Sequence, residues 1–246
     1  MDEGILRVFK ESSHHSKLPD TRIIGKKIYY FDKLDSTNDL AFSLALQNKK
    51  EGEVIAANIQ GKGKGRLGRK WYSPKGGIYF SIILRPDILI DKAGLITLMS
   101  AVAVCKALRA MGLNTQVKWP NDIVVGRRKL CGILTEIDAA GQDVQFLVVG
   151  VGINNKIKRD ELPVNATSIY EELDQTFLNE DVLREVLKYL DREYLLFKDK
   201  KTDIIIKEFK DFSSLLDKEV TVAIGNRETK GKVQDFAADG ALILRH

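Results

Sequence analysis

Apolar and polar residues repeat along this chain with two different periods. Runs rich in Ile, Val, Tyr and Phe, bounded by Gly, Pro or Asp, are typical of strands. They predict strands at residues 27–32, 54–58, 78–84, 116–119, 123–125, 130–137 and 144–151. Apolar residues at helical spacing predict helices at residues 40–48, 93–111, 181–197 and 202–212. Because strands and helices are interleaved, we expect an α+β domain in which helices pack on a mixed β-sheet.

The last thirty residues differ in character. Apolar and polar positions alternate over residues 220–224, 231–236 and 241–244, and Asp239-Gly240 is typical of a tight hairpin turn. This pattern predicts a small β-barrel appended to the main domain. At the other end, His14 and His15 lie in an irregular stretch without an evident third metal ligand, which favours a mobile tail over a metal site. We therefore divide the chain into a tail, a main domain and a small β-domain, at residues 1–25, 26–213 and 214–246.

Composition narrows the class of protein. Of 246 residues, 44% are hydrophobic and 30% are charged, as in ordinary globular proteins. The most apolar stretch, residues 94–105, is interrupted by polar residues and falls short of the ~20 residues that cross a bilayer. Residues 1–10 lack the apolar core of a signal peptide. Cys105 and Cys131 have apolar neighbours and are typical of buried free thiols. We therefore expect a cytoplasmic protein with no membrane partner.

The net charge of +5 comes from one loop. Residues 62–70 carry five positive charges and no negative charge, so the rest of the chain sums to zero. Gly63, Gly65 and Gly68 satisfy G-x-G-x-x-G, but a dinucleotide-binding fold needs a helix there, and Pro74 soon afterwards forbids one. The loop also lacks the Gly-Lys-Ser/Thr ending of a P-loop. A flexible basic loop between two strands can close over a polyphosphate; a solvated loop or a nucleic-acid contact is the alternative.

A second polar group follows in residues 118–122 and 129–134. Asp122 comes just after a proline and an asparagine, where a carboxylate can be held rigidly for Mg²⁺. Lys129 opens a mostly apolar strand, so it is either a surface hairpin residue or a cation that points into a pocket. Gly132 would let a ligand lie close to that strand. Trp119 is more typical of core packing than of ligand stacking.

Taken together, these motifs resemble those of the biotin–protein ligases. The stretches that carry the resemblance occur in the family's order, at residues 35–38, 60, 63–71, 73–77, 118–122, 129–134 and 150–154. The C-terminal β-rich segment is similar to the family's SH3-like domain. The resemblance implies a class II synthetase-like catalytic domain and two half-reactions. Biotin and ATP give biotinyl-5′-AMP and pyrophosphate, and a carrier-protein lysine then takes the biotin.

The resemblance also implies roles for individual residues. The implied catalytic residues are Lys129, Arg66 and Lys64. The implied biotin-binding residues are Ser36, Thr37, Asn38, Gln60, Lys64, Gly65, Arg66, Lys129 and Gly132, of which the first four hold the ureido ring. The implied ATP- and adenylate-binding residues are Arg66, Arg69, Trp71, Lys118, Asn121 and Asn154. Asp122 is the implied ligand of Mg²⁺.

Two loop positions depart from the family pattern. The loop often has arginine where Lys64 stands and another cation where Leu67 stands. Lysine keeps the charge but lacks the planar fork of arginine, which weakens the expectation of tight adenylate retention.

The resemblance extends to partners and leaves rival interpretations. The implied partner is the biotin-acceptor domain of a carboxylase, the biotin carboxyl carrier protein, and the family's edge-to-edge pairing of sheets makes a homodimer the expectation. Some relatives carry an N-terminal helix-turn-helix, but only about 25 residues precede the first predicted strand, so we expect no operator binding and no DNA partner. A lipoate ligase of the same fold and a non-enzymatic nucleic-acid binder are the alternatives.

Overall fold

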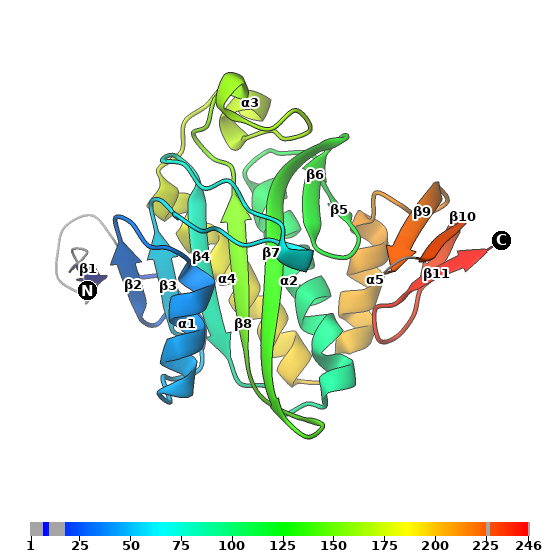
Figure 1. The fold of residues 1–246 in the computed structure, drawn as a ribbon, viewed down its shortest axis with the longest axis horizontal. Coiled ribbons are helices and arrows are strands. Elements are labelled where there is room, and N and C mark those ends of the chain that lie inside the picture. Colours follow the sequence, from blue (N-terminus) through cyan, green and yellow to red (C-terminus); the bar gives the residue numbers. More distant parts are fainter. Residues whose placement is uncertain (1–6, 10–17, 225–226, 246) are drawn as a thin grey trace.

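A mixed eight-stranded sheet forms the centre of the molecule (Figure 1). The computed structural model describes residues 7–9, 18–224 and 227–245. In spatial order the strands are β1 (Arg7–Phe9), β2 (Ile28–Phe31), β3 (Val54–Ala57), β4 (Ile78–Leu84), β8 (Asp143–Ile153), β7 (Arg128–Ala140), β6 (Asp122–Val125) and β5 (Thr115–Lys118). β2 and β3 run parallel, and the other neighbouring pairs are antiparallel.

Helices cover both faces of this sheet. One face of the sheet carries α2 (Ala93–Ala110), α4 (Asn179–Lys198) and α5 (Thr202–Phe212), while α1 (Thr37–Leu46) lies on the opposite face (Figure 1). The central strand β4 is buried throughout, and alternation along it sends Phe80 and Ile82 into the larger core and Ile83 into a small core beneath α1. The predicted α+β class, with helices packed on a mixed sheet, is confirmed.

The helix α2 is the most apolar element of the chain. The segment Ile90–Ala110 is long and apolar enough to cross a membrane by length and composition, so the expectation that this stretch is too short is wrong. However, 72% of the most apolar window is buried inside the protein. Burial of this kind is what a core helix shows, because each of its faces meets the sheet or another helix.

A separate three-stranded antiparallel sheet follows α5. It consists of β9 (Glu219–Ile224), β10 (Arg227–Phe236) and β11 (Leu242–Arg245), with β10 in the middle. The ring of Phe236 packs edge-on against Phe209 of α5 at 5.0 Å between centroids. The predicted hairpin turn is present, with Gly240 at a φ of +86°, and its carbonyl oxygen accepts a hydrogen bond of 3.0 Å from Trp119 Nε1. The predicted small C-terminal β-domain is therefore confirmed, and this turn attaches it to the main sheet.

The N-terminal segment departs from the predicted irregular tail. Residues 7–9 form β1 and pair with β2 at the edge of the sheet. Ile24 is fully buried, and the Asp191 carboxylate of α4 accepts the backbone N–H groups of residues 22–24 at 2.7–2.8 Å. These long-range contacts hold residues 7–9 and 22–24, whose sequence shows no period. His14 and His15 lie outside the described residues. The short helix α3 (Ile169–Leu173) was also not predicted.

Candidate active site

Segments far apart in the sequence line one cavity of about 610 Å³. Its walls come from the start of α1, the basic loop, the β5–β6 connection, β7, β8 and the C-terminal sheet. Every site residue that the family resemblance implied, except Asn154, lies on this wall: Ser36, Thr37, Asn38, Gln60, Lys64, Gly65, Arg66, Arg69, Trp71, Lys118, Asn121, Asp122, Lys129 and Gly132. The structure thus brings together residues whose common site was an expectation.

The cavity is strongly cationic. Among the described residues that line it, six are basic and one is acidic: Lys64, Arg66, Arg69, Lys70, Lys118 and Lys129 against Asp122. A concave surface with this excess of one sign concentrates a ligand of the opposite charge. The wall therefore suits an anion with several charges, such as a polyphosphate.

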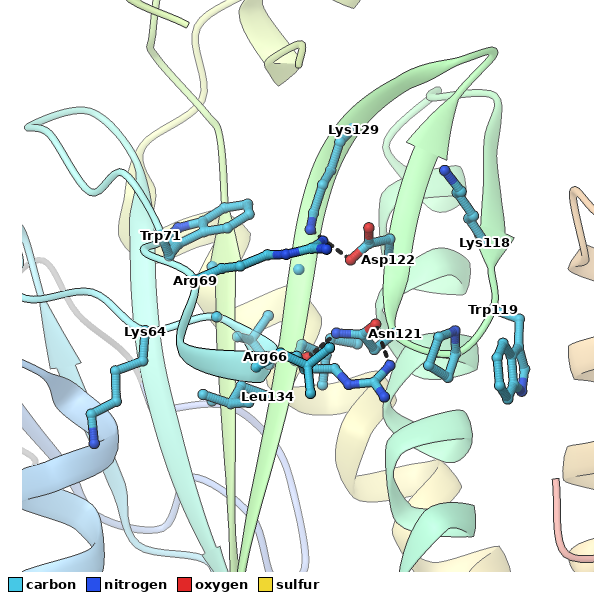
Figure 2. A pocket seen from close by; sticks show the side chains of 18 of the residues that line it. Lys64, Arg66, Arg69, Trp71, Lys118, Trp119, Asn121, Asp122, Lys129 and Leu134 are labelled. Atoms are coloured by element: carbon cyan, nitrogen blue, oxygen red, sulfur yellow. Dashed lines mark hydrogen bonds and ion pairs between the residues drawn. The ribbon is translucent and has the colours of Figure 1, made fainter. Parts of the chain in front are cut away.

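Lys129 and Asp122 form an ion pair inside this cavity. They lie on the neighbouring strands β7 and β6, and Lys129 Nζ is 2.7 Å from Asp122 Oδ1. Figure 2 shows Lys129 and Arg69 directed toward the same space beside Asp122. The backbone of Lys129 is also held by residues 165 and 167, through bonds of 2.8 and 2.9 Å. The sequence left Lys129 as either a surface hairpin residue or a cation that points into a pocket, and the structure supports the second alternative.

Asp122 is therefore already engaged by a cation. No group of three or more His, Cys, Asp or Glu side chains that could hold a metal ion occurs in the described part of the chain. A metal held by protein side chains alone does not fit this site. A magnesium ion that keeps most of its ligands from water and substrate phosphates needs only one or two carboxylates, and Asp122 fits that requirement.

The indole ring of Trp71 covers two glycines of the sheet. Gly132 of β7 and Gly152 of β8 are paired in register, and a Cβ atom at Gly152 would lie 2.4 Å from Trp71 Nε1. A Cβ at Gly132 would lie 3.0 Å from the same ring. We expected Gly132 to admit a ligand, but in this structure the space above it holds Trp71. Lys129 Nζ lies 5.2 Å from the centroid of that ring, within the range of a cation–π contact.

A chain of hydrogen bonds occupies the opposite end of the cavity. Gln60 Oε1 accepts from the backbone N–H and the hydroxyl of Thr37, at 2.9 and 3.1 Å. Gln60 Nε2 donates to Ser73 Oγ at 2.9 Å. Ser36 caps α1 by accepting the N–H of Asp39, and this bond uses a lone pair rather than the hydroxyl hydrogen. Hydroxyl and amide groups therefore gather where the cavity meets the start of α1.

Asn38 extends this chain to residues that the sequence did not point out. Its Oδ1 accepts from Ser81 Oγ at 2.6 Å, and its Nδ2 donates to Glu136 Oε2 at 2.7 Å. A Cβ at Gly150 would lie 1.9 Å from Asn38 Oδ1, so this glycine makes room for the amide. Both ends of the Asn38 amide are held by protein, which favours a supporting role over direct ligand contact. Ser81 is the single polar residue in the apolar run 78–84, and that signal could have found it.

Two cations of the basic loop, Lys64 and Arg66, bond to residues outside the loop. Lys64 bonds to Asp39 and lies 3.7 Å from Glu136 Oε1, and its bond to Asp39 raises the pKa of the Lys64 amine. Lys64 points away from Arg66 and Lys129 (Figure 2). Arg66 donates to Asn121 Oδ1 at 3.3 Å. The loop cations are thus spread over the wall rather than gathered on one point.

Four further placements concern Leu67, Asn154, Trp119 and the C-terminal sheet. Leu67, at the tip of the loop, is 87% exposed. Asn154 is buried beside the cavity rather than on its wall, and its Nδ2 donates to Thr167 O at 2.9 Å; its expected role in adenine recognition stays a prediction. Trp119 packs against the core, as its sequence context predicted, and also lines the cavity. The C-terminal sheet contributes wall residues that the sequence did not indicate, at positions 220–223 and 242.

Known proteins are similar to this chain in sequence and in fold. Residues 30–154 match the Biotin/lipoate A/B protein ligase family. The bifunctional ligase/repressor BirA of Bacillus subtilis is 37% identical over 180 residues, which cover 71% of this chain and 55% of that protein. The chain thus spans little more than half the length of this relative. The protein of the same name from Escherichia coli is 30% identical over 228 residues, 89% of this chain and 70% of that one.

A solved structure is similar over most of both chains. The biotin protein ligase from Aquifex aeolicus in complex with biotin and ATP superposes with a TM-score of 0.77 at 30% identity, and the match covers 89% of this chain and 91% of that one.

Proposed function

Because this chain belongs to the Biotin/lipoate A/B protein ligase family, we propose that it is a biotin–protein ligase. One observation carries the proposal: a single cavity has hydroxyl and amide groups at one end and lysines and arginines at the other. Biotin has a ureido ring that donates and accepts hydrogen bonds, and a carboxylate on a flexible chain. The dithiolane ring of lipoate has no N–H or O–H donor, so the polar end suits biotin better.

The first half-reaction joins two anions. A carboxylate oxygen of biotin attacks the α-phosphorus of ATP, the bond to the β-phosphate oxygen breaks, and pyrophosphate leaves. Lys129, with Arg69 and Lys118, supplies positive charge where the two anions approach. The ion pair with Asp122 and the contact with Trp71 fix the Lys129 amine at that point.

The second half-reaction consumes the mixed anhydride. The amine of a carrier lysine attacks the acyl carbon, the bond to the phosphate oxygen breaks, and AMP leaves as the amide forms and the amine loses its proton. Water would hydrolyse the same anhydride, so the site has to exclude it. We assign this protection to the basic loop, with Arg66 and Lys64 closing over the adenylate.

A magnesium ion is part of the proposed chemistry. When bound with ATP, it neutralises phosphate charge during the displacement. Asp122 is the residue that would contribute a carboxylate to it, with the phosphates and water as the other ligands.

The proposal extends to partner and compartment. The relative from Paracoccus denitrificans is named a biotin–[acetyl-CoA-carboxylase] ligase, and we assign a biotin carboxyl carrier domain as the acceptor here. Cys105 and Cys131 are buried free thiols, which supports a reducing compartment such as the cytoplasm.

Biotin-dependent exchange between ATP and pyrophosphate tests the proposal. The assay is run with Mg²⁺ and with biotin, lipoate or octanoate as the acid. Exchange with biotin alone is the expected result. Exchange with lipoate or octanoate instead would keep the fold and the basic loop but reject Ser36, Thr37 and Gln60 as ureido ligands. A folded protein that shows no exchange with any of the three acids would remove the enzyme assignment.

A further inference from the structure

A second cavity of about 320 Å³ adjoins the main one. Five residues line both cavities: Arg66, Trp119, Pro120, Ile133 and Leu134. In Figure 2 the labelled members of this shared wall lie below the group formed by Lys129, Arg69 and Asp122. The two cavities therefore meet at this wall. A further cavity, beside the start of α4, shares none of its described lining residues with the main one.

The far wall of the second cavity comes from both domains. Thr97 and Leu98 belong to α2, Thr135 belongs to β7, and residues 239–241 form the C-terminal hairpin turn. Leu98 is buried, and the hydroxyls of Thr97 and Thr135 bond to each other at 2.8 Å. Asp239 is exposed. The cavity is therefore largely apolar within and reaches solvent at an acidic rim.

The two cavities differ in charge. Six basic residues and one acidic residue line the main cavity, whereas Arg66 and Asp239 are the charged residues among the described lining of the second. A protonated lysine is a cation on an aliphatic stem, and such stems lie along apolar surface. The main wall repels this cation, while Asp239 attracts it to the rim of the second cavity.

The second half-reaction imposes two opposing requirements. The adenylate has to be covered against water, yet one amine has to reach it. Six residues of the basic loop line the main cavity, but Arg66 alone of the described loop residues 62–70 lines the second. A loop that covers the main cavity therefore leaves most of the second cavity uncovered.

We propose that the second cavity is the entry route of the acceptor lysine. This inference rests on the proposed function. The lysine ammonium meets Asp239 at the rim, its stem lies along Leu98 and Leu134, and its nitrogen reaches the adenylate beside Arg66. The ammonium loses one proton to water before it attacks. The nitrogen then bonds to the acyl carbon, the bond from that carbon to the oxygen of AMP breaks, and the second proton passes to water as the amide forms.

A bulky side chain at the rim tests the route. Ala241 is exposed and lines the second cavity, whereas Ala238 is exposed in the same turn and lines neither cavity. The measurement is single-turnover transfer from preformed biotinyl-AMP to the biotin carboxyl carrier domain of an acetyl-CoA carboxylase. We expect Ala241→Phe to slow transfer about tenfold or more and to leave biotin-dependent ATP–pyrophosphate exchange within about twofold. Ala238→Phe should leave both rates unchanged.

Removal of the rim charge tests the electrostatic part. The Asp239 carboxylate accepts the N–H of Ala241 at 3.0 Å, and the amide oxygen of Asp239→Asn keeps this bond without the charge. We expect kcat/KM for the carrier domain to fall about fivefold at low salt, and the difference from wild type to shrink as salt is raised. Asp217→Asn removes one exposed charge from the same C-terminal segment, outside both cavities, and is the control.

The outcomes separate this inference from the function it rests on. Wild-type protein that shows no biotin-dependent exchange overturns the proposed function. Normal wild-type exchange, with transfer in Ala241→Phe no slower than in Ala238→Phe, overturns the entry route alone. Equal losses of exchange and transfer in Ala241→Phe would place the turn in adenylate formation and also overturn the route. If Ala241→Phe does not fold, Asp239→Asn against Asp217→Asn decides by the same two rates.

Discussion

Lys129 Nζ and Asp122 Oδ1 lie 2.7 Å apart on neighbouring strands, and both side chains line the cationic end of the cavity. Each is partly exposed, at 35% and 24% of the side chain. The pair therefore holds a cation where two substrate anions have to meet, and it keeps the single lining carboxylate from repelling them.

Replacement of this lysine should affect chemistry rather than folding. In Lys129→Ala the carboxylate of Asp122 stays in the site without its partner, so we expect adenylate formation to slow by about 10²–10³-fold. Single-turnover formation of biotinyl-AMP is the measurement, with thermal unfolding as the check on the fold. Lys207→Ala, which breaks the exposed pair with Asp211, serves as control and should react normally. A normal single-turnover rate in Lys129→Ala would remove this lysine from the site.

Loss of Arg66 should release the intermediate. In the described structure the Arg66 side chain donates to one side chain, Asn121 at 3.3 Å, which leaves most of its guanidinium available to an adenylate. We expect Arg66→Gly to leak biotinyl-AMP and to increase biotin labelling of bystander lysines by about tenfold or more. Arg127→Gly, in the exposed β6–β7 turn, is the matched control. Label confined to the carrier protein in Arg66→Gly would contradict the proposed closure.

A methyl group added at Gly152 should displace the Trp71 ring. The new Cβ would lie 2.4 Å from Trp71 Nε1, and overpacking of this kind destabilises by about 1–3 kcal/mol. Because the backbone of Trp71 also pairs with Gly63, the basic loop should shift with the ring, and adenylate formation should slow about tenfold. Gly94→Ala, whose new Cβ meets nothing closer than 3.6 Å, should keep wild-type activity. Equal rates of adenylate formation in the two variants would show that the position of the Trp71 ring on Gly152 does not matter for the reaction.

Glu193 gives the protein a pH-dependent stability term. Burial raises the pKa of Glu193, although Lys106 lies 2.7 Å from its carboxylate. Because the pKa of Glu193 is higher in the folded state than in the unfolded state, its contribution to folding stability is fully present at pH values below the usual carboxyl pKa. The contribution is lost as the pH rises through the raised pKa of the folded state. Glu193→Gln, which cannot ionise, should therefore gain stability relative to wild type as the pH rises from the usual carboxyl range through the raised pKa of Glu193. Denaturant unfolding measured below and above that pH range checks this, and Glu185→Gln, in a half-buried pair with Lys188, is the control.

The expected homodimer has its own test. The strands β1 and β5 are the edges of the main sheet within the described residues, and unpaired edges are where two sheets can join. We expect sedimentation as a dimer at micromolar concentration in the presence of biotin and ATP. A monomer under all ligand conditions would refute this expectation.

Elements with strong local patterns were predictable from the sequence. The run 78–84 gave the bounds of β4, and α5 begins and ends where its spacing predicted. β1 and α3 were not predicted, because each is short and is held by partners that are distant in the sequence. Three residues are too few to show a period, and the β-strand at residues 7–9 exists through its pairing with β2.

The candidate site was predictable as a set of residues but not as a set of contacts. Periodicity cannot show that Trp71 lies on Gly132 and Gly152, or that Glu136 holds Asn38, because these contacts depend on how strands and loops meet in space. The buried position of Asn154 has the same cause. The residues that the sequence missed lie on strands whose pattern predicts a strand and nothing more: Ser81 on β4, Glu136 on β7 and residues 220–223 on the C-terminal sheet.

Both tryptophans of the chain, Trp71 and Trp119, line the cavity. One ring is carried by the basic loop, and the other holds the turn at Gly240 of the C-terminal sheet. The intrinsic fluorescence of this protein at tryptophan wavelengths therefore arises entirely at the cavity wall. Ligand arrival and loop closure can be followed by emission from the unlabelled protein, and Trp71→Phe and Trp119→Phe would assign each part of the signal to the loop or to the domain junction.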